Sequence, residues 1–144
     1  MTGQDPMSYA GDVPPSVAFA TLRDVPGAIL VDVRTAPELA FVGRPDLSSI
    51  GKQVVHVVWQ RYPDGTVNEH FGEQLTESGL DPSQPILFIC RSGNRSASAA
   101  QAATRAGYEQ AYNVAEGFEG PLDESGHRGT RGGWKVAGLP WRQP

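Results

Sequence analysis

The sequence predicts an α/β fold in which a central parallel sheet is covered by helices on both faces. Two observations lead to this prediction. Short apolar runs rich in β-branched residues alternate along the chain with short segments that have helical character and end near a glycine or proline. The most apolar of these runs, 86–89, leads into an alanine-rich segment, as a buried strand leads into a helix. At 144 residues, one domain accommodates all of these elements.

The first elements follow a polar start. Residues 1–13 are rich in Gly, Pro and Asp, so we expect a flexible N-terminal tail there and a single domain over 14–144. A first short helix is predicted around 17–22, and the apolar run 28–33 is predicted to be a buried strand. A proline suited to a first helical turn opens a second short helix, predicted over 37–41.

The remaining elements continue the alternation. The β-branched run 54–58 is predicted to be a strand covered on both faces, and 70–78 a helix closed by a glycine. After a turn cluster come the strand 86–89, an alanine-rich helix over 96–106 and a short strand over 111–114. We found no internal repeat in the sequence.

Composition excludes several classes of function. The net charge of −4 and the pI near 5.3 argue against a nucleic-acid partner, which usually selects a basic surface. The sequence shows neither a secretory signal nor a run of roughly 20 apolar residues, so we expect a cytoplasmic protein that does not insert into membranes. One cysteine and three dispersed histidines offer no disulfide and no metal-ligand spacing, and we expect no metal and no cofactor.

The chemistry is concentrated in one loop, which lies between the most apolar strand and the alanine-rich helix. It reads Cys90-Arg91-Ser92-Gly93-Asn94-Arg95-Ser96. In open α/β sheets, ligands bind at the carboxyl ends of the strands. Backbone N–H groups at a helix start, together with two arginines, form a site for an anion and favour a thiolate. The sequence therefore predicts that Cys90 is a reactive nucleophile.

The other residues of the loop have physical roles to match. Gly93 can take a positive φ and let the backbone fold around the sulfur, and Ser96 is placed to act as the helix N-cap. Arg91 and Arg95 supply permanent positive charge for an anionic substrate. We expect Arg95 to matter more than Arg91.

This loop resembles the active loop of the rhodanese family, Cys-x-x-Gly-x-Arg-Ser/Thr. Asp32-Val33-Arg34 followed by Glu38 is similar to the family's first-strand motif, and the stretch Gly132-Gly133-Trp134 to Gly138-Leu139-Pro140 is similar to its closing motif. The resemblance spans residues 15–144 and implies a rhodanese-like three-layer fold. We interpret Asp32 and Arg34 as a structural ion pair that fixes nearby loops, with no part in the chemistry.

The resemblance implies a sulfurtransferase. Cys90 would take sulfur from a small anionic donor such as thiosulfate, hold it as a persulfide, and pass it to a thiol, to cyanide or to a protein acceptor. Two alternatives stay open. A cysteine phosphatase or arsenate reductase also places a Cys and an Arg around an oxyanion, but its loop is one residue longer than the four residues enclosed by Cys90 and Arg95. A non-catalytic binding module is the other, although it occurs in relatives that lack the cysteine.

Residues outside the loop receive simpler interpretations. The glycine-rich stretch 117–133 is long enough to form a flap near the site. We expect Trp134 and Trp141 to be packing anchors, His127 to be exposed, and His56 to be a core or edge histidine with its hydrogen bonds satisfied.

Overall fold

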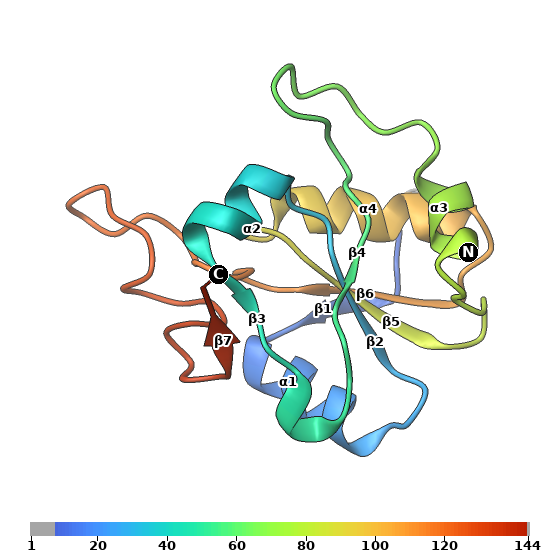
Figure 1. Ribbon diagram of the computed structural model, residues 1–144, viewed down its shortest axis with the longest axis horizontal. Coiled ribbons are helices and arrows are strands. Elements are labelled where there is room, and N and C mark those ends of the chain that lie inside the picture. Colours follow the sequence, from blue (N-terminus) through green and yellow to red (C-terminus); the bar gives the residue numbers. More distant parts are fainter. Residues whose placement is uncertain (1–7, 144) are drawn as a thin grey trace.

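The structure is a computed structural model that describes residues 8–143, and its centre is a five-stranded parallel sheet (Figure 1). The strand order is β1-β6-β5-β2-β4. The five strands are β1 (Gly11–Val13), β2 (Ile29–Asp32), β4 (Val55–His56), β5 (Pro85–Ile89) and β6 (Gln110–Val114). A separate antiparallel pair joins β3 (Arg44–Pro45) to β7 (Trp141–Arg142). The α/β class with a central parallel sheet is therefore confirmed.

Helices cover both faces of this sheet. They are α1 (Pro15–Asp24), α2 (Ala36–Val42), α3 (Phe71–Glu77) and α4 (Asn94–Arg105), with a 3₁₀ turn, η1 (Ser48–Ile50). Each expected helix is present, with bounds that differ from the prediction by one or two residues at most ends. Pro37 stands in the first turn of α2, where its fixed φ suits a helix start.

Two cores result from the alternation of side chains along the strands. Residues Ile86, Phe88 and Cys90 of the β5 segment face α3 and α4, whose alanines allow close approach to the sheet. The intervening Leu87 and Ile89 face α1 on the other side. This alternation decides that the side chain of Cys90 lies on the α4 face.

The start of the domain differs from the prediction. Residues 11–13, expected to belong to a flexible tail, form β1 and pair in parallel with β6, with Asp12 opposite Asn113. Glycine and aspartate have low strand propensity, so this strand is formed because β6 offers an open edge and not because of its own sequence. Residues 1–7 of the expected tail lie outside the described residues.

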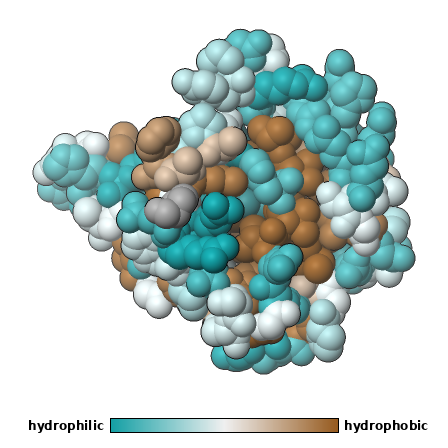
Figure 2. Space-filling view, in the orientation of Figure 1, coloured by the Kyte–Doolittle hydropathy of each residue, from teal (hydrophilic) through white to brown (hydrophobic). Residues whose placement is uncertain are grey.

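The strand predicted over 54–58 is shorter and less covered than expected. β4 has only two residues, lies at the edge of the sheet, and leaves His56 exposed. Figure 2 shows apolar surface in the middle of this face, with hydrophilic residues around it. The run of valines therefore forms a short edge strand that pairs with β2, while Val57 just beyond it is buried in the core that contains Phe71 of α3.

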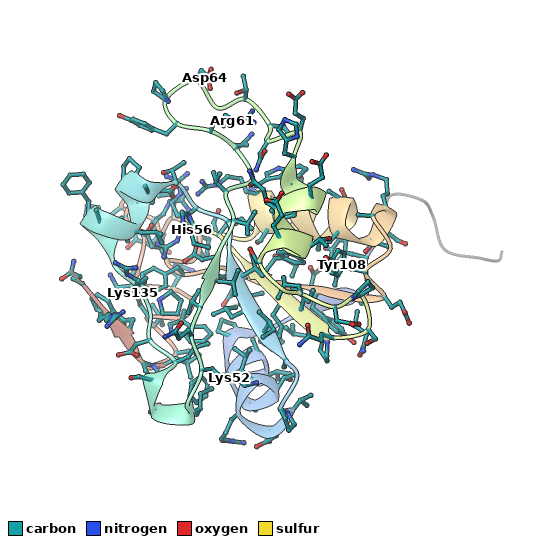
Figure 3. The ribbon with its side chains drawn as sticks, turned by 45° about the vertical axis from the view of Figure 1, so that its right-hand side comes forward. Lys52, His56, Arg61, Asp64, Tyr108 and Lys135 are labelled. Carbon is teal, nitrogen blue, oxygen red and sulfur yellow. The ribbon has the colours of Figure 1, made fainter. Side chains whose placement is uncertain are left out.

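A long loop follows β4 and projects from the sheet, carrying Arg61 and Asp64 at a distance from Tyr108 and the base of α4 (Figure 3). A bridge between Gln60 and Val67 closes this loop into a short hairpin. Within residues 8–143, no helix combines the length and apolar character needed to cross a bilayer.

Candidate active site

Cys90 immediately follows β5, at the carboxyl end of the sheet, as the sequence predicts. Its side chain is 1% exposed, yet it forms part of the wall of a cavity of about 430 Å³. The other lining residues come from α2, from the loop after β4 and from the segment 90–96: Glu38, Gln60, Arg91, Ser92, Asn94 and Arg95. The thiol is thus shielded by protein and faces this cavity.

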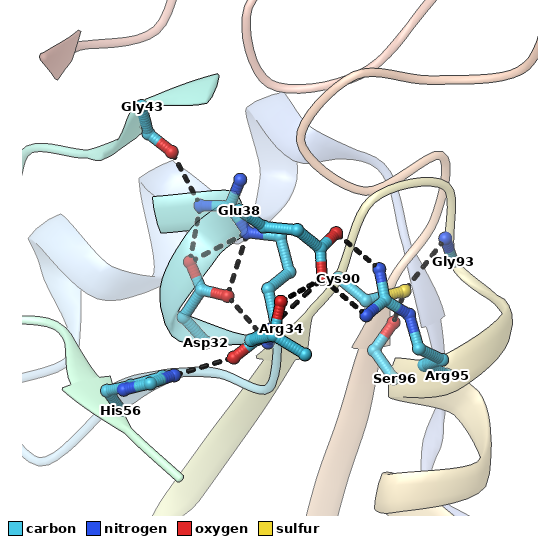
Figure 4. A network of polar contacts seen from close by, with 10 residues as sticks. Asp32, Arg34, Glu38, Gly43, His56, Cys90, Gly93, Arg95 and Ser96 are labelled. Atoms are coloured by element: carbon cyan, nitrogen blue, oxygen red, sulfur yellow. Dashed lines mark hydrogen bonds and ion pairs between the residues drawn. The ribbon is translucent and has the colours of Figure 1, made fainter. Parts of the chain in front are cut away.

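The sulfur is held from two sides (Figure 4). The backbone N–H of Gly93 donates to Sγ at 3.1 Å, and Oγ of Ser96 lies 3.1 Å from Sγ. Gly93 has φ +109°, a conformation that favours glycine, and a Cβ there would approach the backbone N of Glu116 to 3.3 Å. The positive φ that the sequence predicts for Gly93 is confirmed.

Ser96 is not the helix N-cap that the sequence suggests. α4 begins at Asn94 with Gly93 as its N-cap, so Ser96 is the third helical residue and its buried hydroxyl points at Cys90. Among residues 8–143, no side chain caps α4, which leaves the N–H groups of its first turn without a side-chain partner at the cavity. This helix start supplies donors and positive potential where an anion would enter.

Arg95 is engaged by a carboxylate. Its two terminal nitrogens donate to Oε1 and Oε2 of Glu38 in a bidentate pair, each at 2.7 Å. The Glu38 hydrogen bond raises the pKa of Arg95. Burial raises the pKa of Glu38, but the Arg95 pair and the N–H of Thr35 outweigh it and lower that pKa to about 2. Both groups are therefore charged near neutral pH.

The remaining loop residues line the cavity, but their side chains differ in whether an ion pair holds them in place. Arg91 is exposed, and among residues 8–143 it forms no ion pair, whereas Arg95 is bound to Glu38. Ser92 and Asn94 line the cavity beside it. The positive charge that can move toward a bound anion is therefore that of Arg91, a distinction that the sequence does not reveal.

Asp32 and Arg34 form the structural ion pair that the sequence predicts. The guanidinium Nη2 lies 2.7 Å from Asp32 Oδ2, with both side chains almost fully buried, and it also donates to the carbonyl of Gly43. The guanidinium stacks over the ring of Phe118, 4.4 Å from its centroid. This pair joins the end of β2 to the segments around it and does not line the Cys90 cavity.

The start of the glycine-rich stretch is part of the active loop's support. The N–H groups of Phe118 and Glu119 donate to the carbonyls of Cys90 and Arg91 at 2.8 and 2.9 Å. Gly117 approaches so closely that a Cβ there would lie 2.5 Å from the carbonyl oxygen of Cys90. Further along, the exposed His127 lines a neighbouring cavity that also includes Arg91. The sequence predicts a flap near the site in this stretch but carries no signal for these backbone hydrogen bonds.

Three aromatic residues lie where the sequence predicts. Trp134 is fully buried and donates its Nε1–H to the carbonyl of Pro140 at 2.7 Å. Trp141 packs edge-on against Phe118, but it is less buried than a packing anchor would be, with 38% of it exposed. His56, on the edge strand, bonds through Nε2 to the carbonyl of Arg34 at 2.6 Å.

Comparison with known proteins agrees with this geometry. A protein-family model described as the STR4 middle domain matches residues 11–144. The chain is 31% identical over 135 residues to the chloroplastic protein THYLAKOID RHODANESE-LIKE of Oryza sativa subsp. indica, a match that spans 93% of this chain and 25% of that protein. The chain belongs to the rhodanese-like family. At the level of the family, it is a sulfurtransferase-type domain.

Relatives of this rhodanese-like domain include small proteins of similar length. It is 36% identical over 126 residues to an uncharacterized protein of Rickettsia conorii, covering 87% of this chain and 91% of that one. The crystal structure of Rv0390 from M. tuberculosis superposes with a TM-score of 0.87 at 54% identity, covering 95% of this chain and all of that one. A polysulfide-sulfur transferase from Wolinella succinogenes, with a TM-score of 0.62 and 24% identity, shares the fold.

Proposed function

We propose that this rhodanese-like domain is a sulfurtransferase in which Cys90 carries sulfane sulfur as a persulfide, from a small anionic donor such as thiosulfate to a thiophilic acceptor. One observation carries the proposal. The sulfur of Cys90 lies at the wall of a polar cavity, against the N–H of Gly93 and the uncapped start of α4. An outer sulfur atom bound to Sγ and extending into this cavity would carry its negative charge toward donors that already converge there.

The residues present account for both half-reactions. The Cys90 thiolate attacks the outer sulfur of thiosulfate, forming a new S–S bond, while the bond to the sulfonate sulfur breaks and sulfite leaves with the electron pair. An acceptor nucleophile then attacks the outer sulfur of the persulfide and releases the Cys90 thiolate. Arg91 attracts the anionic donor, and the first-turn N–H groups of α4 bind the charged outer sulfur. Neither step requires a cofactor.

Phosphatase chemistry is supported less well. A cysteine phosphatase needs a general acid that is protonated near neutral pH in order to release the alcohol. Glu38 is the carboxylic side chain that lines the Cys90 cavity, and its pair with Arg95 lowers its pKa to about 2. It is therefore ionised and cannot donate a proton to a leaving group. The lining of the cavity favours sulfur transfer for this reason.

The acceptor is a thiol, cyanide or a protein. The cavity at Cys90 is broad enough for a small molecule and adjoins a second cavity that shares Glu38 and Arg91 and extends along the glycine-rich stretch. A protein acceptor would therefore contact this stretch as its thiol approaches Cys90.

The test is sulfur loading followed by mass spectrometry. After incubation with thiosulfate and removal of the excess, the intact protein should gain the mass of one sulfur atom, and cyanide should remove it with release of thiocyanate. Cys90→Ser should neither gain the sulfur nor release thiocyanate. Turnover of an aryl phosphate by a protein that takes up no sulfur would contradict the proposal and favour the phosphatase alternative.

A further inference from the structure

A chain of polar contacts connects Cys90 to the edge of the sheet. Oγ of Ser96 lies 3.1 Å from Sγ of Cys90 and 2.5 Å from Oδ1 of Asn113. Nδ2 of Asn113 donates to Oδ1 of Asp12 at 2.9 Å, and the hydroxyl of Tyr9 donates to the same oxygen at 2.6 Å. Ser96 and Asn113 are buried, so water does not replace these partners. The function proposed above uses neither Asn113 nor Asp12.

The direction of each hydrogen bond in this series follows from the Asp12 carboxylate, with which the series ends. The amide nitrogen of Asn113 donates to Oδ1 of Asp12, which fixes the orientation of the Asn113 amide. Its amide oxygen then faces Ser96, and this oxygen also can only accept. The single hydroxyl hydrogen of Ser96 therefore lies between Ser96 and Asn113. An oxygen–oxygen separation of 2.5 Å requires that hydrogen, because two lone pairs at this distance would repel.

This hydrogen-bond direction determines what Ser96 presents to the nucleophile Cys90. With its hydrogen committed to Asn113, Ser96 presents a lone pair to Cys90. A protonated Cys90 can donate its S–H to this lone pair, whereas a thiolate meets it unfavourably. For Ser96 to donate to the thiolate, it must withdraw its hydrogen from Asn113 and leave a buried acceptor unpaired, which is costly.

We propose that Asp12 and Asn113 are positioning residues that, through Ser96, favour the thiol and persulfide forms of Cys90 over the bare thiolate. In the persulfide, Sγ is neutral and the charge resides on the outer sulfur, so the Ser96–Asn113 bond stays intact. The contacts of Ser96 then favour the sulfur-loaded form of Cys90 over the unloaded thiolate. This inference rests on the proposed persulfide role of Cys90 only for its biological purpose, since the effect on the thiol is independent of the donor.

Other charged groups around Cys90 stay in place when this chain of contacts is altered. They come from every element packed near the loop: Arg91 and Arg95 beside the sulfur, Glu38 on α2, Asp32 and Arg34 at the end of β2, and Glu116 after β6. None of them is hydrogen-bonded to Asn113 or Asp12. Asn113→Leu therefore changes the contacts of Ser96 while leaving these charges in place, whereas Asp12→Ala also removes one negative charge.

The experiment is the pH dependence of alkylation of Cys90 by iodoacetamide, which reacts with the thiolate. Asn113→Leu keeps the volume but removes the acceptor, so Ser96 is free to donate to the thiolate. We expect the midpoint of the profile to move down by about one pH unit, with an unchanged plateau at high pH, because a hydrogen bond to a charged group is worth about tenfold in such an equilibrium. Asp12→Ala should shift the midpoint in the same direction, since the freed amide of Asn113 can rotate. Because this variant also removes a negative charge, only the part of its shift that disappears in a Ser96→Ala background supports the inference.

Two controls separate this effect from damage to the fold. Tyr9→Phe leaves Asp12 as an acceptor, so its profile should match the wild type. In a Ser96→Ala background, Asn113→Leu should have no further effect on the midpoint. A wild-type midpoint in both Asn113→Leu and Asp12→Ala, a shift that persists without Ser96, or a raised plateau without a shift overturns the inference. Thiosulfate loading of the wild type, measured in parallel, tests the proposed function separately.

Discussion

The Glu38–Arg95 pair offers a prediction that the structure makes quantitative. Glu38→Gln removes the charge while keeping an oxygen that can accept from Arg95 and from the N–H of Thr35, so the capping of α2 is preserved. The pKa of Glu38 falls from 4.5 to about 2 in the folded protein. A shift of this size corresponds to about 3 kcal/mol in free energy of unfolding, and solvent screening at a partly exposed pair reduces it to about 1–2 kcal/mol.

The sign of the pH dependence follows from the direction of that pKa shift. A carboxylate whose folded pKa is depressed stabilises the protein above its unfolded pKa, and this contribution is lost as the pH falls through the folded pKa. The wild type should therefore be more stable than Glu38→Gln by about 1–2 kcal/mol at pH 7, which is roughly 5 °C in Tm for a chain of this size. The difference should shrink below pH 4.5 and vanish near pH 2.

The assay is urea denaturation of both proteins at several pH values between 7 and the lowest at which the wild type stays folded. Gln retains the hydrogen-bonding oxygen, so the two proteins differ mainly in the charge at residue 38. A difference in free energy of unfolding that came from packing instead would not depend on pH. Equal stability of the two proteins at pH 7, or a difference that stays constant down to pH 3, would refute the reasoning. Glu38→Gln should also increase thiosulfate uptake at low donor concentration, because the positive charge of Arg95 is then no longer neutralised by a carboxylate.

Two further predictions concern the active loop. Gly117→Ala places a Cβ 2.5 Å from the carbonyl oxygen of Cys90 at φ +62°, and it should lower the free energy of unfolding by about 2–4 kcal/mol and abolish most of the sulfur loading. The control Gly126→Ala, with φ +79° and no atom within 4 Å of the new Cβ, should lower it by about 1 kcal/mol and retain loading. Equal effects of the two variants in denaturation and loading assays would contradict the close approach at Gly117. Arg91→Ala should raise KM for thiosulfate several-fold with little change in kcat, while Arg23→Ala on α1 should leave both unchanged, and steady-state thiocyanate release measures them.

The local sequence was sufficient to predict the elements with strong patterns. The apolar run before Cys90 and the alanine-rich run after it can form little else than a buried strand and a helix, and both are present as β5 and α4. The segments with weak patterns, 11–13 and 54–58, differ in the structure from what their sequences predict. β1 forms from Gly11, Asp12 and Val13 because β6 offers an edge. β4 is an edge strand of two residues because of its place in the strand order, and neither fact is contained in the local sequence.

The same division applies to the site. Sequence alone determined that Cys90, Gly93 and Arg91 share one loop between strand and helix, because loop residues are neighbours along the chain. Only tertiary structure decided that Arg95 is bound by Glu38 and that Ser96 bonds to Asn113, since these partners are 57 and 17 residues apart and meet through sheet order and helix packing. A polar Asn113 in an apolar strand was the one sequence signal for that second contact. Hydrogen bonds between distant residues depend on which strands are adjacent, and that order results from the packing of the whole domain.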